Sequence, residues 1–324
     1  MKSPAVTCLI LCKHASLLWL LATSQVLYAN NEDITEEPPV VDILKPLDEP
    51  RDEFSRQVLG FANWLDSFFG ENRIYEETRG NYLKLRLINT IEEGGSPNYD
   101  LKVKAKINLP RTENRLKLLI INEPDEDRVE NKRDIPLEVL EAQDPAIALQ
   151  YTPESTSKWR NSTDAGIRLR STPDAFLRLR TQRPFEHGNW TLRPTQSLYW
   201  FRSVGTGETT QLDIERELGS KYLFRATSAA TWLHQNRYFD LAQEFSLFHD
   251  LDKRRAVVYQ VGVNGISQPD PHKTNYGVSV RLRKQIHRDW LFFEINPRIN
   301  YTEDNGFNAV KSLRLELEAI FGKY

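Results

Sequence analysis

Residues 310–321, V-K-S-L-R-L-E-L-E-A-I-F, decide the fold. Apolar side chains occupy every second position of this stretch, at Leu313, Leu315, Leu317, Ala319 and Phe321, and charged ones alternate with them at Arg314, Glu316 and Glu318. A period of two is that of a β-strand with one apolar and one polar face. The stretch ends three residues before Tyr324, the last residue. In a chain that begins like an exported protein, such a closing strand predicts an outer-membrane β-barrel.

The same alternation recurs along the chain from Tyr82 onward. It is found at residues 83–87, 101–109, 116–120, 146–152, 166–171, 176–181, 190–201, 211–218, 222–232, 239–247, 257–263, 277–283 and 291–301. Many of these segments approach the ~10-residue length that a tilted membrane strand needs. We therefore expect an all-β fold, an antiparallel transmembrane β-barrel of roughly 12–14 strands over residues 81–324.

The alternation also predicts which side chains face lipid and where the ring closes. Val103, Leu179, Val280 and Ile295 are expected to face lipid. Closure is expected between segments 83–87 and 313–317, because this pairing sets Lys84 and Arg86 beside Glu316 and Glu318. Opposite charges on neighbouring strands help to set the register of a sheet.

Composition excludes several classes of protein. The 324 residues carry a formal charge of −2. This near-balance lacks the basic excess that is typical of nucleic-acid-binding proteins. A mean hydropathy of −0.55 excludes a multi-helix membrane protein but not a barrel, in which only alternate residues need be apolar. Both cysteines, Cys8 and Cys12, lie in the first 29 residues. The rest of the chain can therefore form no disulfide or thiolate metal site.

Three segments precede the barrel. Residues 1–29 have a basic start and an apolar core, which predicts a signal peptide and export. Residues 30–50 are acidic and rich in proline, which predicts an extended linker. Residues 51–70 carry an aromatic apolar stripe at helical spacing and end at Gly70, which predicts one amphipathic helix. We expect this helix to dock at, or partly into, the periplasmic mouth of the barrel and to restrict any pore.

Charged residues on the polar face of the strands are the candidate functional residues. Those expected to face the lumen are Lys84, Arg86, Lys102, Lys104, Lys106, Lys117, Arg168, Arg170, Arg178, Arg180, Arg281, Arg283, Asp213, Glu215, Glu316 and Glu318. Two interpretations remain open. The charges could pair across a narrow, filled interior, or they could line a water channel and bias it towards anions, as rings of Arg and Lys do.

Other functions stay open as alternatives. A soluble periplasmic β-sheet protein that binds lipid or polysaccharide would show similar alternation. A lipid-modifying outer-membrane enzyme could use His272 beside Thr274 and Asn275, although no catalytic, cofactor or metal-binding motif is found. The acidic stretch 123–144 predicts a loop outside the cell, with a weak cation site as the alternative.

Four short stretches resemble a family of exported, outer-membrane β-barrel-like proteins of Gammaproteobacteria. They are WLDSFFG at 64–70, TDAGIRLR at 163–170, GETT at 207–210 and IHRDWLFFEI at 286–295. The resemblance runs from about residue 51 to 321 and implies the same layout of signal, linker, helix and strands. It implies no catalytic residues and no cofactor. The expected partners are outer-membrane lipid and, during biogenesis, the barrel-assembly machinery.

Overall fold

The computed structural model describes residues 65, 68–69, 81–109, 115–122, 145–153, 158–288 and 290–322. The predicted signal peptide, the linker, most of the predicted helix and the acidic loop 123–144 lie outside these residues. No helix in the described part of the chain is long and apolar enough to cross a bilayer.

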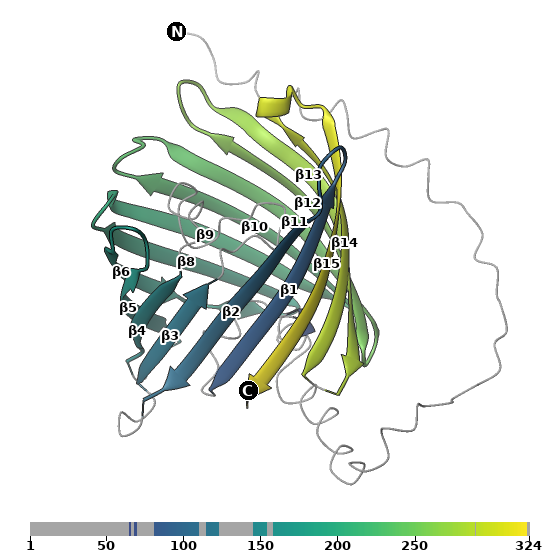
Figure 1. Cartoon of the computed structure of the whole chain (residues 1–324), viewed down its shortest axis with the longest axis horizontal. Coiled ribbons are helices and arrows are strands. Elements are labelled where there is room, and N and C mark those ends of the chain that lie inside the picture. The colour runs from purple at the N-terminus through teal and green to yellow at the C-terminus, as the bar shows by residue number, and fades with distance from the viewer. Residues whose placement is uncertain are drawn as a thin grey trace, which may run out of the picture. The chain divides into compact units, whose positions relative to one another are not determined.

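The described strands form one antiparallel sheet (Figure 1). Their bounds are β1 (Tyr82–Glu92), β2 (Asn98–Asn108), β3 (Leu116–Asn122), β4 (Ala146–Tyr151), β5 (Arg160–Arg168), β6 (Asp174–Gln182), β7 (Phe185–His187), β8 (Trp190–Phe201), β9 (Gly205–Leu218), β10 (Tyr222–Leu233), β11 (Phe239–Asp252), β12 (Arg255–Ile266), β13 (His272–His287), β14 (Leu291–Thr302) and β15 (Ala309–Gly322). Every strand except β7 belongs to a closed ring. This confirms the predicted barrel at the upper end of the expected strand number.

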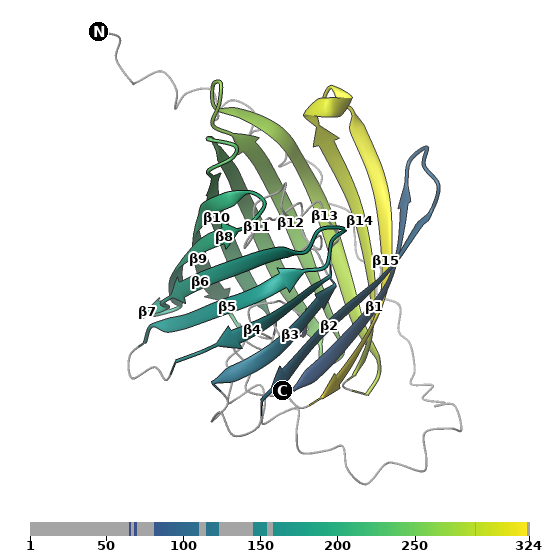
Figure 2. The same ribbon diagram turned by 60° about the vertical axis from the view of Figure 1, so that its left-hand side comes forward.

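Two pairings between strands that are not consecutive in the chain complete the ring. Strand β1 pairs with β15, with Leu87 opposite Leu317, as the sequence predicts. Strand β6 pairs with β8 because the three-residue β7 folds back on the start of β8 instead of entering the ring. Figure 2 shows β1 to β6 across the front of the ring, with the later strands behind. A single closed sheet also rules out the predicted alternative of a soluble two-sheet protein.

Several predicted strand limits are wrong. Strand β5 begins at Arg160 and ends at Arg168, whereas the alternation suggested 166–171. Strand β9 begins at Gly205 rather than residue 211, and β13 extends to His272 and His287. In each case backbone pairing continues through residues whose side chains are polar on both faces. Alternation of apolar and polar residues cannot reveal such pairing. The β7 hairpin was missed because a strand of three residues is too short to show alternation.

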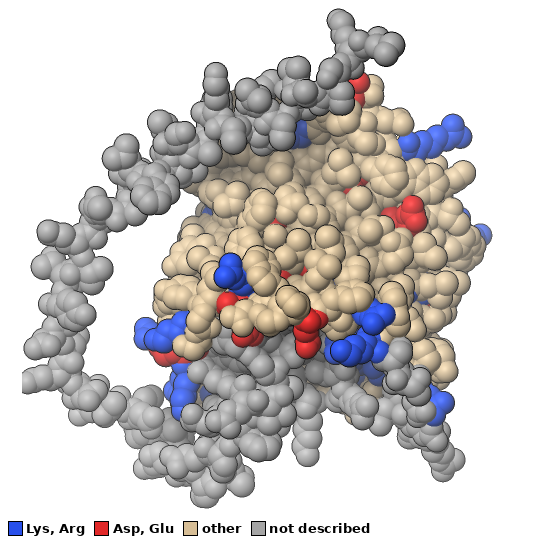
Figure 3. All heavy atoms as spheres, turned by 180° about the vertical axis from the view of Figure 1, so that it is seen from behind, with Lys and Arg blue, Asp and Glu red and all other residues tan. Residues whose placement is uncertain are grey.

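The burial of side chains is inverted relative to a water-soluble protein. Inward positions hold buried charges, including Lys84 at 2% exposure and Glu318 at 1%. Outward positions hold exposed apolar side chains, including Leu179 at 43% and Val280 at 38%, as predicted; Val103 and Ile295 are half-buried. Figure 3 shows a wall made mostly of uncharged residues. Exposed apolar area on this scale marks a surface that faces something other than water.

Three residues of the predicted helix are described, and their side chains lie inside the barrel. The Phe69 amide donates to the Leu65 carbonyl at 2.9 Å, which is a helical hydrogen bond. Leu65, Phe68 and Phe69 are buried in a cluster with inward side chains at the end where β15 stops. The strand residues of this cluster are Tyr82, Leu223, Phe248, Ala256, Val258, Phe292 and Ile320. We call this end of the barrel the C-terminal end.

Candidate functional site: the charged barrel interior

None of the sixteen predicted lumen residues is among the exposed ones. Lys84, Arg86, Lys102, Lys106, Lys117, Arg168, Asp213, Glu215, Arg281, Arg283, Glu316 and Glu318 are buried. Lys104, Arg170, Arg178 and Arg180 are half-buried, and Arg170 lies in the turn after β5 rather than in a strand. Their role in conduction stays a prediction.

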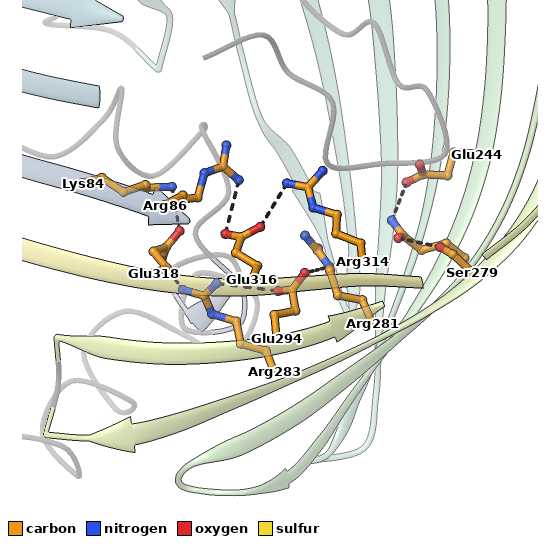
Figure 4. Close-up of polar contacts among 11 residues, drawn as sticks. Lys84, Arg86, Glu244, Ser279, Arg281, Arg283, Glu294, Arg314, Glu316 and Glu318 are labelled. Atoms are coloured by element: carbon orange, nitrogen blue, oxygen red, sulfur yellow. Dashed lines mark hydrogen bonds and ion pairs between the residues drawn. The ribbon is translucent and has the colours of Figure 1, made fainter. Parts of the chain in front are cut away.

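A continuous row of charges crosses the seam between β1 and β15 (Figure 4). Glu318 binds Lys84, with Nζ to Oε2 at 3.4 Å, and also contacts the Arg283 guanidinium. Glu316 lies 3.6 Å from Arg86 and 3.0 Å from Arg314. Each carboxylate therefore sits between two cations.

The row continues onto the neighbouring strands. Glu294 of β14 lies between Arg281 and Arg283 of β13, at 3.9 Å and 3.6 Å. Because Arg283 contacts both Glu294 and Glu318, it joins the seam to the β13–β14 pair. We call Lys84, Arg86, Arg281, Arg283, Glu294, Arg314, Glu316 and Glu318 the seam cluster. Each of these buried carboxylates has two cationic partners. Buried ions need such partners, because each charge removed from water loses hydration energy.

Other inward charges also pair with adjacent strands. Glu215 of β9 contacts Arg193 of β8 at 3.2 Å and Arg225 of β10 at 2.8 Å. Near the opposite end, Arg168 pairs with Asp174, the first residue of β6. These pairs run along the wall, between strands that are neighbours or next neighbours. The alternative in which charges also pair across a narrow, filled interior stays a prediction.

Sequence reasoning missed a part of the interior in which uncharged polar side chains surround one carboxylate. Glu244 accepts a hydrogen bond from Ser246 at 2.7 Å and one from Gln260 at 3.5 Å. Ser279 of β13 donates to Gln260 at 3.3 Å, which extends the network over three strands. Serine and glutamine do not stand out in a search for charges. Their position between exposed apolar residues, such as Val278 and Val280 around Ser279, was the available signal.

The two sides of the interior differ in charge. On β1–β6 the buried basic residues Lys84, Arg86, Lys102, Lys106, Lys117 and Arg168 outnumber the buried acids Asp164 and Asp174. On β8–β15 the buried acids are in excess: Asp213, Glu215, Glu244, Asp250, Glu294, Glu316 and Glu318 against Arg193, Arg225, Arg281, Arg283 and Arg314. Among the buried residues, the interior therefore has a basic side on β1–β6 and an acid-bearing side on β8–β15.

Aromatic side chains narrow the C-terminal end. The Phe68 ring packs edge-on against Phe292 at 5.7 Å, and Phe69 packs against Phe248 at 5.8 Å. The Arg281 guanidinium lies 4.9 Å from the centre of the Phe69 ring, within the range of a cation–π interaction. Phe68 and Phe69 therefore lie inside the C-terminal end of the barrel, while docking of the whole helix at the periplasmic mouth stays a prediction.

The histidine considered for catalysis has other contacts. His272 Nδ1 lies 2.7 Å from the Asp270 carbonyl oxygen, and Nε2 lies 3.6 Å from a Glu303 carboxylate oxygen. The neighbouring Asn275 accepts a hydrogen bond from Asn264 at 2.8 Å. These contacts engage the imidazole with Asp270 and Glu303, and the amide with Asn264.

The closed sheet and the inverted burial define the class of protein. In lipid every backbone polar group must be paired within the protein, and a closed ring of strands achieves this. An outward apolar wall around a polar interior is the pattern of transmembrane barrels. The protein is an integral β-barrel of the outer-membrane type.

No protein-family model matches this sequence, and no curated protein matches it significantly. Several solved porins are similar in structure. A porin refined at 1.8 Å resolution is 13% identical over 75% of this chain and 100% of its own, with a TM-score of 0.47. OmpT of Vibrio cholerae is 10% identical over 76% and 99%, with a TM-score of 0.45. The porin KdgM, solved with disordered oligogalacturonate, is 6% identical over 73% and 98%, with a TM-score of 0.36. The class of this protein rests on its own geometry.

Proposed function

We propose that the protein is an outer-membrane channel with a narrow, charged lumen that favours anions. The proposal includes export through the signal peptide of residues 1–29 and membership of the Gammaproteobacterial family that the sequence resembles. Under this proposal the protein conducts ions across the outer membrane and is not an enzyme.

The basic excess on β1–β6 is the observation that carries the proposal. Lys84 is directly opposite Lys104 in the pairing of β1 with β2, and Arg86 is opposite Lys102. Like charges directly opposite each other destabilise a sheet. A wall with this excess of basic side chains would attract a passing anion. Rings of Lys and Arg give pores this preference.

Ion pairs between neighbouring strands are compatible with a lumen that conducts. Pairs that run along the wall, such as Lys84 with Glu318, hold neighbouring strands together and need no bridge across the interior. The aromatic contacts of Phe68 and Phe69 occupy one end only. We therefore expect a small conductance.

Planar-bilayer recording tests the proposal. In a salt gradient the reversal potential should have the sign for anion preference. Replacing Lys102, Lys104 and Lys106 together by glutamine should lower the anion-to-cation permeability ratio. Lys284→Gln is the matched control, because Lys284 is exposed and points away from the interior. Absence of conductance from a folded barrel, or an equal effect of the control, would contradict the proposal.

A further inference from the structure

Polar side chains interrupt the apolar outer wall over β8–β11. They are Gln196, Thr210, Ser228 and Gln243, which we call the outer polar patch. Their outward direction follows from their buried neighbours. Thr195 and Ser197, at 4% and 1% exposure, flank Gln196 and face the interior. The other three members also have a buried, inward-facing neighbour: Thr209 beside Thr210, Thr227 beside Ser228, and Glu244 beside Gln243.

The outer polar patch lies within the apolar band rather than at its edge. Gln196 stands between the exposed Trp190 and Trp200 on β8, and Ser228 stands between Tyr222 and Trp232 on β10. Aromatic residues at both ends of a strand mark the two membrane interfaces. The patch therefore faces the hydrocarbon region, where polar groups need hydrogen-bond partners.

The hydrogen bonds within the patch use the oxygens of its two amides. The amide N–H groups can therefore donate to another molecule. The Thr210 hydroxyl donates to Gln196 Oε1 at 2.6 Å, and the Ser228 hydroxyl donates to Gln243 Oε1 at 2.5 Å. Each amide nitrogen carries two N–H groups. Among the described residues, Gln196 Nε2 has one contact, to Glu208 at 3.4 Å, and Gln243 Nε2 has one, to the Glu244 carbonyl at 3.4 Å. The hydroxyl oxygens keep lone pairs that can accept.

The wall is hollowed at the same place. A hollow of about 630 Å³ lies over β9–β12 and is lined by Thr210, Ser228 and Gln243 of the patch. Small residues, Ala230 of β10 and Gly265 of β12, make room for it. At interfaces within membranes, small residues allow close approach and polar side chains bond across.

We propose that the outer polar patch is the contact surface between two copies of this chain in the membrane. The patch is self-complementary, because it contains amide N–H donors and hydroxyl acceptors and needs no opposite charge from a partner. All copies in one membrane share an orientation. A twofold axis along the membrane normal therefore brings the two patches together at the same depth, as an isologous interface requires. Acyl chains would fill the hollow but leave the amide donors without acceptors.

Cysteine cross-linking of the full-length chain in its membrane tests this interface. Ser228→Cys places a thiol in the hollow, and Val280→Cys is the control, at an exposed apolar site on β13. Under oxidising conditions we expect most of the Ser228→Cys protein to run at twice the chain's mass. Val280→Cys should stay at the background of the natural chain, whose cysteines, Cys8 and Cys12, lie in the first 29 residues.

A second variant tests the hollow itself. Ser228→Trp should lower the dimer fraction in mild detergent at least tenfold, while the unheated band on a gel shows that the barrel is folded. Equal cross-linking of the two cysteine variants, a product with another protein's mass, or a natural chain that is monomeric in both detergent and membrane would overturn the proposal. None of these outcomes depends on whether the barrel conducts.

Discussion

The carboxylate of Glu318 should hold the barrel closed. It lies between Lys84 and Arg283, and its side chain is 2% exposed. Glu318→Gln keeps the size of the side chain and removes its charge. The two cations then face each other without the anion that separates them.

The expected magnitude follows from the distances and the burial. Two unit charges 3.4 Å apart attract by about 5 kcal/mol at an effective dielectric constant of about 20. Removing one partner of a buried ion pair typically costs about 3–5 kcal/mol, because a desolvated charge is left behind. We therefore expect Glu318→Gln to lower the free energy of unfolding by about 3–5 kcal/mol.

The matched control is an exposed ion pair beside the same two strands. Glu93, just after β1, pairs with Lys311 of β15 at 3.5 Å, but these side chains are 56% and 66% exposed. Exposed pairs contribute about 0–1 kcal/mol, so Glu93→Gln should be nearly neutral. Urea unfolding in lipid vesicles, followed by tryptophan fluorescence, measures both variants.

A double variant identifies the interaction. If Glu318→Gln acts through Lys84, the double variant Glu318→Gln/Lys84→Met should lose less unfolding free energy than the two single variants lose in sum. Should Glu318→Gln prove no more destabilising than Glu93→Gln, the seam would be held by its backbone pairing alone, and the burial argument would be refuted.

Three further predictions concern the seam, the wall and the mouth. A cysteine pair at Leu87 and Leu317, which are directly opposite across β1 and β15, should cross-link within one molecule under oxidising conditions; links only between molecules would contradict the closure. Val280→Arg, on the outer wall, should cost about 2–4 kcal/mol in vesicles, whereas Ser279→Arg, facing the interior, should cost less; equal costs would refute the assignment of faces. Phe69→Ala removes the ring that packs against Phe248 and Arg281, so single-channel conductance should rise, and an unchanged value with a folded barrel would show that the ring does not restrict the pore.

The sequence by itself determined the faces of the strands and the seam. Alternation is a local property, because successive side chains of a strand point to opposite sides. The leucines of residues 313–317 therefore predicted an outward face, and Glu316 and Glu318 an inward one. The opposite charges at Lys84 and Arg86 then predicted the partner strand, and both ion pairs are present.

Only the tertiary structure decided which inward charges meet. Arg283 reaches Glu318 two strands away as well as Glu294 on the adjacent strand, and no spacing in the sequence encodes that choice. The outer polar patch was hidden for a similar reason, because Thr210 meets Gln196 and Ser228 meets Gln243 only once their strands are in register. Alternation sets the side of the sheet that each residue faces. Its partners depend on the register and curvature of the closed ring, which arise from pairing between residues far apart in the chain.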